Sequence, residues 1–223
     1  MSAWAEFLAA MFTFLGSHAI FLRPGVRTPI SQVIGRNGFT FGFSLLSVGL
    51  LYWVIVAAAN APYVEVLPPA QALRWVPLLV MPVVCLLVTS GISLNNPLSF
   101  GGLGKVPFDP NTPGLLAVTR HPLLLALVIW AAAHMLGNGD LAHVILFGLF
   151  AGFSWIGMRI LDRRRQREMG LAAWSELAQQ THSFSPAAIG QYKLRSWQIS
   201  SAALLYCALI VVHPLVIGVS PLP

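Results

Sequence analysis

The sequence predicts an all-α fold: a polytopic integral membrane bundle of about six transmembrane helices. Of its 223 residues, 57% are hydrophobic and 9% are charged, whereas soluble domains usually carry about 25% charged residues. The apolar residues also gather into runs close to the roughly 20 residues that a helix needs to cross a bilayer. Links between the runs are short, so we expect residues 1–223 to form a single transmembrane domain. The six runs are Trp4–Leu22, Phe39–Ala59, Leu73–Ser93, Leu115–Leu136, Leu141–Ile160 and Trp197–Val219.

The basic residues predict how these helices are oriented. All 13 lysines and arginines except Arg74 lie after the first run, before or at the start of the fourth run, or between the last residues of the fifth run and the start of the sixth. Basic loops stay in the cytoplasm, so we expect both termini outside it, in a bacterial-type inner (plasma) membrane. The formal charge of +6 does not form one basic face, and therefore nucleic acid is not an expected partner. The expected surroundings are the lipid bilayer.

Other segments are expected to shape the bundle. The stretch Leu94–Gly114 holds four prolines, which predict a cytoplasmic loop because proline removes helical donors. After the fifth run, Leu171, Trp174 and Leu177 recur at helical spacing, which predicts an amphipathic helix on the cytoplasmic interface. The two cysteines, Cys85 and Cys207, lie within apolar runs without CxxC spacing and are expected to be small core residues.

Four histidines lie in or at the edges of the apolar runs, where ionisable groups are costly and usually functional. At a rise of 1.5 Å per residue, His18 lies roughly 6–8 Å inside the cytoplasmic edge, and His121 lies at that edge. His134 lies roughly 21 Å beyond Arg120 along the helix axis. His213 is expected at a similar or slightly greater depth. The sequence therefore predicts a lower and an upper pair of imidazoles.

The fourth run is expected to present several of these groups together. At 100° per residue, Arg120, His134 and Asn138 share one helix face, whereas His121 points away from it. Histidine is a common axial ligand of haem iron, and arginine suits the carboxylates of haem propionates. The alternative is that each imidazole only forms a hydrogen bond to a carbonyl or a Ser/Thr hydroxyl on a neighbouring helix. No zinc spacing is present.

The motifs resemble a known family from end to end. The segments "FLGSHAIFLRPGVR", "TRHPLLLALVIWAAAHMLGNGD", "DRRR" and "HPLVIGVSPLP" are similar to the NnrU family, whose pattern also occurs in the 15-cis-zeta-carotene isomerase (Z-ISO) of plants and cyanobacteria. This resemblance implies a multi-spanning haem b protein with His18 and His134 as axial ligands. Arg120 would then orient a haem propionate. His121 and Asn138 would be hydrogen-bond donors that fix the tautomer and ring orientation of the ligating histidines.

The resemblance also implies a class of chemistry. Ferrous haem in the isomerase is thought to exchange a ligand and so permit rotation about a double bond of a cis polyene, and NnrU proteins are associated with nitrogen-oxide respiration. The expected function is therefore redox-gated haem-iron chemistry, leaning towards an isomerase. Its partners would be a hydrophobic polyene (carotenoid) or a small nitrogen-oxide ligand of denitrification, with an electron donor.

Two features limit the transfer from the isomerase. A cysteine three residues before the motif histidine, a candidate switching ligand there, is Ala131 in this chain. The depth estimate also separates His18 from His134 by roughly 14 Å along the membrane normal. His134 with His213, or His18 with His121, are the alternative pairs.

Two other classes of function stay open. RHP before a membrane helix and a later charged turn also resemble membrane methyltransferases that use S-adenosylmethionine, although the turn here reads Asp162-Arg163-Arg164 instead of holding paired glutamates. A non-catalytic scaffold or haem sensor is the third possibility. In that case Asp140 is an N-cap, and the D-R-R segment docks the fifth helix against its neighbours.

Overall fold

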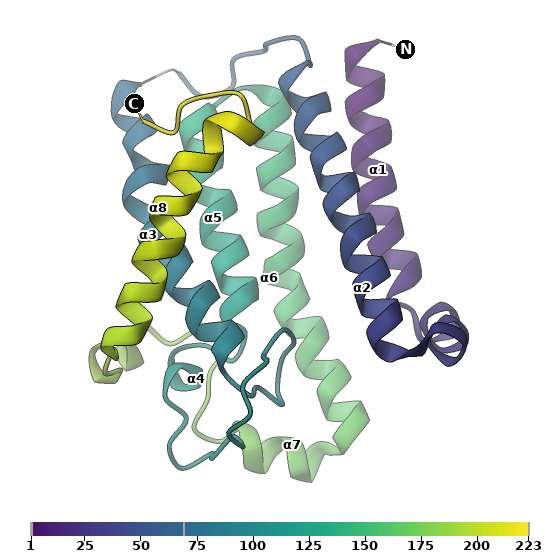
Figure 1. Ribbon diagram of the computed structural model, residues 1–223, viewed down its shortest axis with the longest axis vertical. Coiled ribbons are helices and arrows are strands. Elements are labelled where there is room, and N and C mark those ends of the chain that lie inside the picture. Colours follow the sequence, from purple (N-terminus) through teal and green to yellow (C-terminus); the bar gives the residue numbers. More distant parts are fainter. Residues whose placement is uncertain (1, 69, 223) are drawn as a thin grey trace. The chain divides into compact units, whose positions relative to one another are not determined.

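The computed structural model describes residues 2–68 and 70–222, and helices make up most of this part of the chain (Figure 1). The all-α prediction is confirmed. Five of the described helices are long and apolar enough to cross a membrane, and a sixth, α5, is apolar but shorter. The elements are α1 (Ala3–Phe21), α2 (Pro24–Ala59), α3 (Gln71–Ser93), α4 (Leu115–Val118), α5 (Pro122–Asn138), α6 (Leu141–Met169), α7 (Leu171–Ala178), η1 (Pro186–Gln191) and α8 (Ser196–Val216).

Contacts among the described residues divide the chain into two compact units. Unit 1 contains residues up to 66 together with 140–146, and unit 2 contains 67–139 together with the chain from 147 onward. In unit 1, α1 packs against α2, and the buried side chains of Phe7, Ala10 and Val54 form part of its core. Helix α2 begins at Pro24, well before the predicted Phe39. It consists of two helical stretches joined at a kink at Gly35, where φ is 77°.

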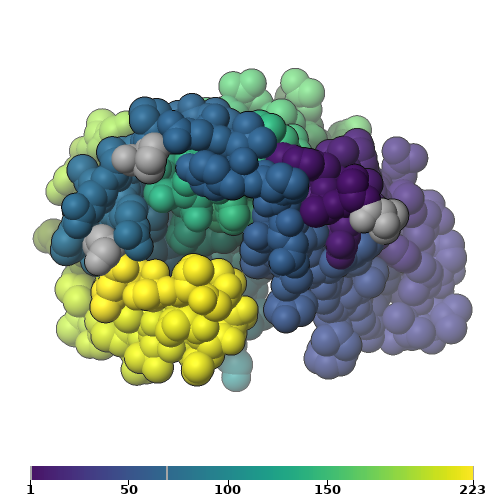
Figure 2. Space-filling view, turned by 90° about the horizontal axis from the view of Figure 1, so that it is seen from above, coloured from purple at the N-terminus to yellow at the C-terminus, as the bar shows by residue number. Residues whose placement is uncertain are grey.

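In unit 2, α3 packs against both α5 and α8 (Figure 1). The contact between α3 and α5 depends on glycine, because a Cβ built on Gly137 would lie 2.8 Å from Cγ of Pro77. The buried core of this unit includes Val84, Leu87 and Leu125. Figure 2, a view from above, shows the end of the chain beside the start of α3, so both lie at one end of unit 2.

The fourth apolar run is not one helix, as the sequence predicted, but two. Helix α4 ends at Val118 and α5 begins at Pro122, because proline lacks an N–H and keeps the residue before it out of the helical region. His121, the residue in question, has φ −121° and ψ 60°. Arg120 therefore precedes α5, and the prediction that it shares a helix face with His134 is wrong.

The other predicted segments are confirmed in part. The loop from 94 to 114 is non-helical and returns along the end of α3, where the Leu103 amide donates to the Ile92 carbonyl at 2.8 Å. Helix α7 forms where the amphipathic pattern placed it, with Ala178 buried. Cys85 is a buried core residue as predicted, but Cys207 is exposed on α8, because no described element covers that face of the helix.

Candidate functional sites

His121 lies in a closed polar cluster at the start of α5. Its side chain is 0% exposed, and its Nε2 lies 3.1 Å from Oδ1 of Asp162 on α6. An ionised carboxylate can only accept, so Nε2 carries the proton and donates, and Nδ1 accepts from the Ser99 hydroxyl at 3.0 Å. Both ring nitrogens of His121 are therefore already used by the protein, which argues against this histidine as an iron ligand in this conformation.

Arg120 occupies the same cluster. One terminal nitrogen donates to the Thr181 carbonyl at 2.7 Å, and the other donates to Oδ2 of Asp162 at 3.0 Å and to the Ser183 hydroxyl at 3.2 Å. The guanidinium also lies over the Trp174 ring, 5.3 Å from its centre, a favourable cation–π position. A haem propionate could bind Arg120 only by displacing these partners.

The sequence did not identify most members of this cluster. The D-R-R pattern is the one sequence feature that points to Asp162, and the contacts of Asp162 to Arg120 and His121 agree with the docking role expected of that segment. The Asn96 side chain donates to the Arg120 carbonyl at 2.8 Å, and Ser99 contacts His121. These two residues come from a loop whose path cannot be read from local patterns.

His134 and His18 have a different environment. In His134, Nδ1 lies 2.8 Å from the Trp130 carbonyl, and in His18, Nδ1 lies 2.8 Å from the Phe14 carbonyl. A carbonyl only accepts, so in both rings Nδ1 carries the proton and Nε2 carries the lone pair. Within the described part of the chain, the one hydrogen-bond partner of His18 Nε2 is the Ser47 hydroxyl at 3.5 Å. For Nε2 of His134 we find no hydrogen bond among residues 2–68 and 70–222.

Aromatic side chains hold each of these rings. The His134 ring lies 5.2 Å from that of Trp130 and 5.4 Å from that of Phe147, measured between centroids. The His18 ring similarly contacts Phe14 and Phe43 in unit 1. The Asn138 amide donates to the His134 carbonyl at 2.7 Å, so the bond that the structure gives it is to the backbone of His134, and its expected role beside the ring stays a prediction.

Two further histidines, His213 and His143, each form a hydrogen bond through Nδ1. His213 on α8 has Nδ1 2.8 Å from the Val219 carbonyl. In unit 1, Asp140 accepts from the His143 amide at 3.2 Å as the predicted N-cap, and its other oxygen lies 2.7 Å from the ring of His143.

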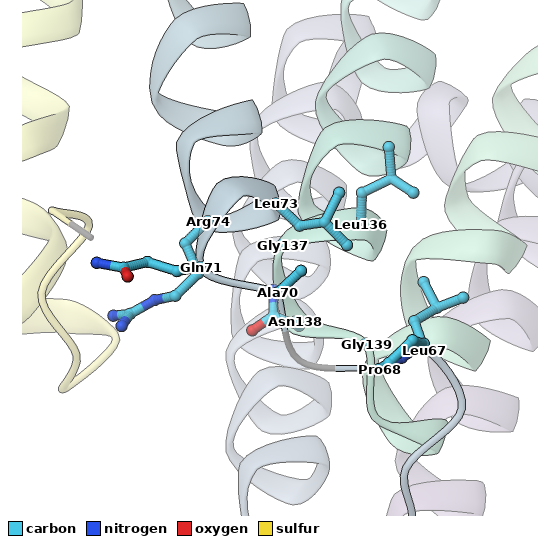
Figure 3. Close-up of a pocket in the computed structure, with 10 residues that line it drawn as sticks. All are labelled: Leu67, Pro68, Ala70, Gln71, Leu73, Arg74, Leu136, Gly137, Asn138 and Gly139. Atoms are coloured by element: carbon cyan, nitrogen blue, oxygen red, sulfur yellow. The ribbon is translucent and has the colours of Figure 1, made fainter.

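Unit 2 also contains a hollow of about 460 Å³ that the sequence did not predict (Figure 3). Its polar side chains come from Gln71 and Arg74 at the start of α3 and from Asn138 at the end of α5. The only available sequence signal was the position of Arg74, the single basic residue predicted on the extracytoplasmic side. The remaining lining residues are Leu67, Pro68, Ala70, Leu73, Leu136, Gly137 and Gly139.

Comparison with known families agrees with the motifs. The family model described as NnrU protein matches residues 6–221. This chain belongs to the NnrU family. The match runs through both units and includes His18, His121, His134 and His213. No curated protein matches the chain, and no solved structure does. With its apolar helices, this NnrU-family chain is a multi-pass membrane protein.

Proposed function

We propose that this NnrU-family protein binds haem b in a bacterial-type inner membrane, and that the imidazoles of His18 and His134 would hold its iron. The observation that carries the proposal is the shared state of the two rings. Each uses Nδ1 to donate to the carbonyl four residues earlier and leaves the Nε2 lone pair for a metal. A hydrogen bond from the far nitrogen is the usual way in which proteins fix the tautomer of a metal-ligating histidine.

The contrast with His121 strengthens this assignment. His121 donates through Nε2 to Asp162 and accepts through Nδ1 from Ser99, so iron binding would break a buried pair. Two imidazoles alone would leave most positions around an iron ion unfilled, and the nitrogens of a porphyrin would fill them.

Bound haem would supply an iron that changes oxidation state and exchanges an axial ligand. The chain's own part is to fix the imidazole of His134. The Trp130 carbonyl sets its tautomer, and the rings of Trp130 and Phe147 set its orientation. Ala131 brings no sulfur to the position three residues before His134. Residue 131 could therefore not supply a thiolate to the iron. The substrates that suit a bilayer site are a cis polyene or a small nitrogen oxide, with an electron donor setting the oxidation state.

The test of haem binding uses protein purified from a haem-replete host. We expect a Soret band that shifts on reduction and a low-spin spectrum typical of two imidazole ligands. His134→Gly and His18→Gly should each lose that spectrum, and added free imidazole should restore it, which separates a lost ligand from a misfolded chain. His143→Ala is the matched control, since its ring bonds Asp140, and should keep full haem content.

Two outcomes would overturn the proposal. One is full haem content with an unchanged spectrum in both glycine variants. The other is a colourless wild-type protein; if that protein bound S-adenosylmethionine, the methyltransferase alternative would be favoured. To test the isomerase reaction, reduced and oxidised protein are incubated with a cis carotene. Conversion of the carotene by the reduced form alone would support the isomerase reaction. If neither form converts it, the isomerase reaction is refuted.

A further inference from the structure

The hollow in unit 2 lies one helical turn from His134. Gly137 and Asn138 line it, and the Asn138 amide donates to the His134 carbonyl at 2.7 Å. Asn138 is four residues beyond His134, a separation of about 6 Å along the helix axis. Arg120, in contrast, lies before the start of α5 at Pro122, and the helix from Pro122 to His134 alone spans about 18 Å.

The walls of the hollow are fixed by close contacts. The Leu67 amide donates to the Gly139 carbonyl at 2.9 Å. Gly139 has φ 73°, and a Cβ on it would lie 3.0 Å from the Leu67 carbonyl oxygen. Gly137 abuts Pro77 and leaves no room for a side chain. The loop before α3 and the end of α5 therefore meet at backbone distance, so the hollow is part of the packed structure.

The two polar side chains from α3 are suited to a carboxylate. In Figure 3, Arg74 and Gln71 extend to the same side, away from Leu67 and Gly139. Among the ion pairs of the described residues, none involves Arg74. A guanidinium presents paired donors that match a carboxylate, and the Gln71 amide adds another donor. In contrast, both terminal nitrogens of Arg120 already bond Asp162, Ser183 or Thr181.

We propose that Arg74, with Gln71, binds the propionate carboxylates of the haem that is ligated through His134. This inference rests on the proposed function. A propionate is a short arm on the porphyrin edge, so its partner must lie near the iron ligand. Arg74 lines the hollow that begins one helical turn from His134, whereas Arg120 lies before α5 and already bonds Thr181 and Asp162. The propionates then face the end of unit 2 where α3 begins, opposite to the end that holds Arg120, His121 and Asp162.

The test compares two cofactors on the same protein. Apoprotein in detergent is titrated with haem b and with haem b dimethyl ester, which lacks the carboxylates but keeps the iron and ring. One or two charge-assisted hydrogen bonds predict that wild-type protein binds haem b about 10- to 100-fold more tightly than the ester. Arg74→Gln should bring the ratio of the two dissociation constants close to one, and Arg74→Lys should restore part of it.

The control is Arg167→Gln, an exposed arginine in the last turn of α6, which should keep the wild-type ratio. An Arg74→Gln variant that binds haem b and its ester in the wild-type ratio would overturn this inference and leave haem binding intact. A wild-type protein that binds neither cofactor would overturn the proposed function itself. The two failures are therefore distinguishable.

Discussion

Replacing Asp162 with alanine tests how the start of α5 is held against α6. The substitution removes the acceptor of two buried donors, the Arg120 guanidinium at 3.0 Å and the His121 ring at 3.1 Å. Breaking a buried ion pair from one side costs about 3–5 kcal/mol, because the remaining charge stays buried without compensation. The side chains of Arg120 and Asp162 keep 12% and 13% of their surface exposed, so water offsets part of this cost.

We therefore expect Asp162→Ala to lower the free energy of unfolding by about 3–4 kcal/mol. For a chain of this size, each kcal/mol moves the melting temperature by roughly 2–4 °C, so the expected shift is about 6–16 °C downward. The assay is thermal unfolding of detergent-solubilised protein followed by intrinsic tryptophan fluorescence. Asp162→Asn, which keeps an acceptor but loses the charge, should fall between the wild type and the alanine variant.

Glu168→Ala provides the matched control on the same helix. Glu168 pairs with Arg164 and Arg165, but its side chain is 40% exposed, and surface pairs contribute about 0–1 kcal/mol. The double variant Arg120→Met with Asp162→Leu should be less destabilised than Asp162→Ala, since it leaves no orphaned arginine. An Asp162→Ala shift no larger than that of Glu168→Ala would refute this reasoning.

Two further predictions concern packing and exposure. Gly137→Ala should lower stability by about 1–3 kcal/mol by overpacking against Pro77, whereas Gly152→Ala, with no atom within 4 Å of the added Cβ, should be neutral or stabilising; equal melting temperatures would contradict the tight contact between α3 and α5. In folded, detergent-solubilised protein, a small maleimide should label the exposed Cys207 faster than the buried Cys85, and both should react after denaturation. Equal rates before denaturation would show that Cys85 is not enclosed.

Some site geometry could have been predicted from the sequence but was not. The carbonyls that bond His18 and His134 belong to Phe14 and Trp130, each four residues earlier in the same helix. A helix places those groups side by side without help from any other element. Helical spacing gave the wrong neighbours for Arg120, because Pro122 breaks the helix before it and Arg120 lies between the end of α4 and the start of α5.

The sequence by itself determined the all-α membrane fold and the family, because apolar runs of bilayer length and local motifs do not depend on which helices meet. Only the tertiary structure decided the partners of the polar residues. His121 joins Ser99 and Asp162, which lie 22 and 41 positions away, and the hollow beside Arg74 exists because the start of α3 packs on the end of α5. Contacts over such separations depend on packing between elements, which no local pattern encodes.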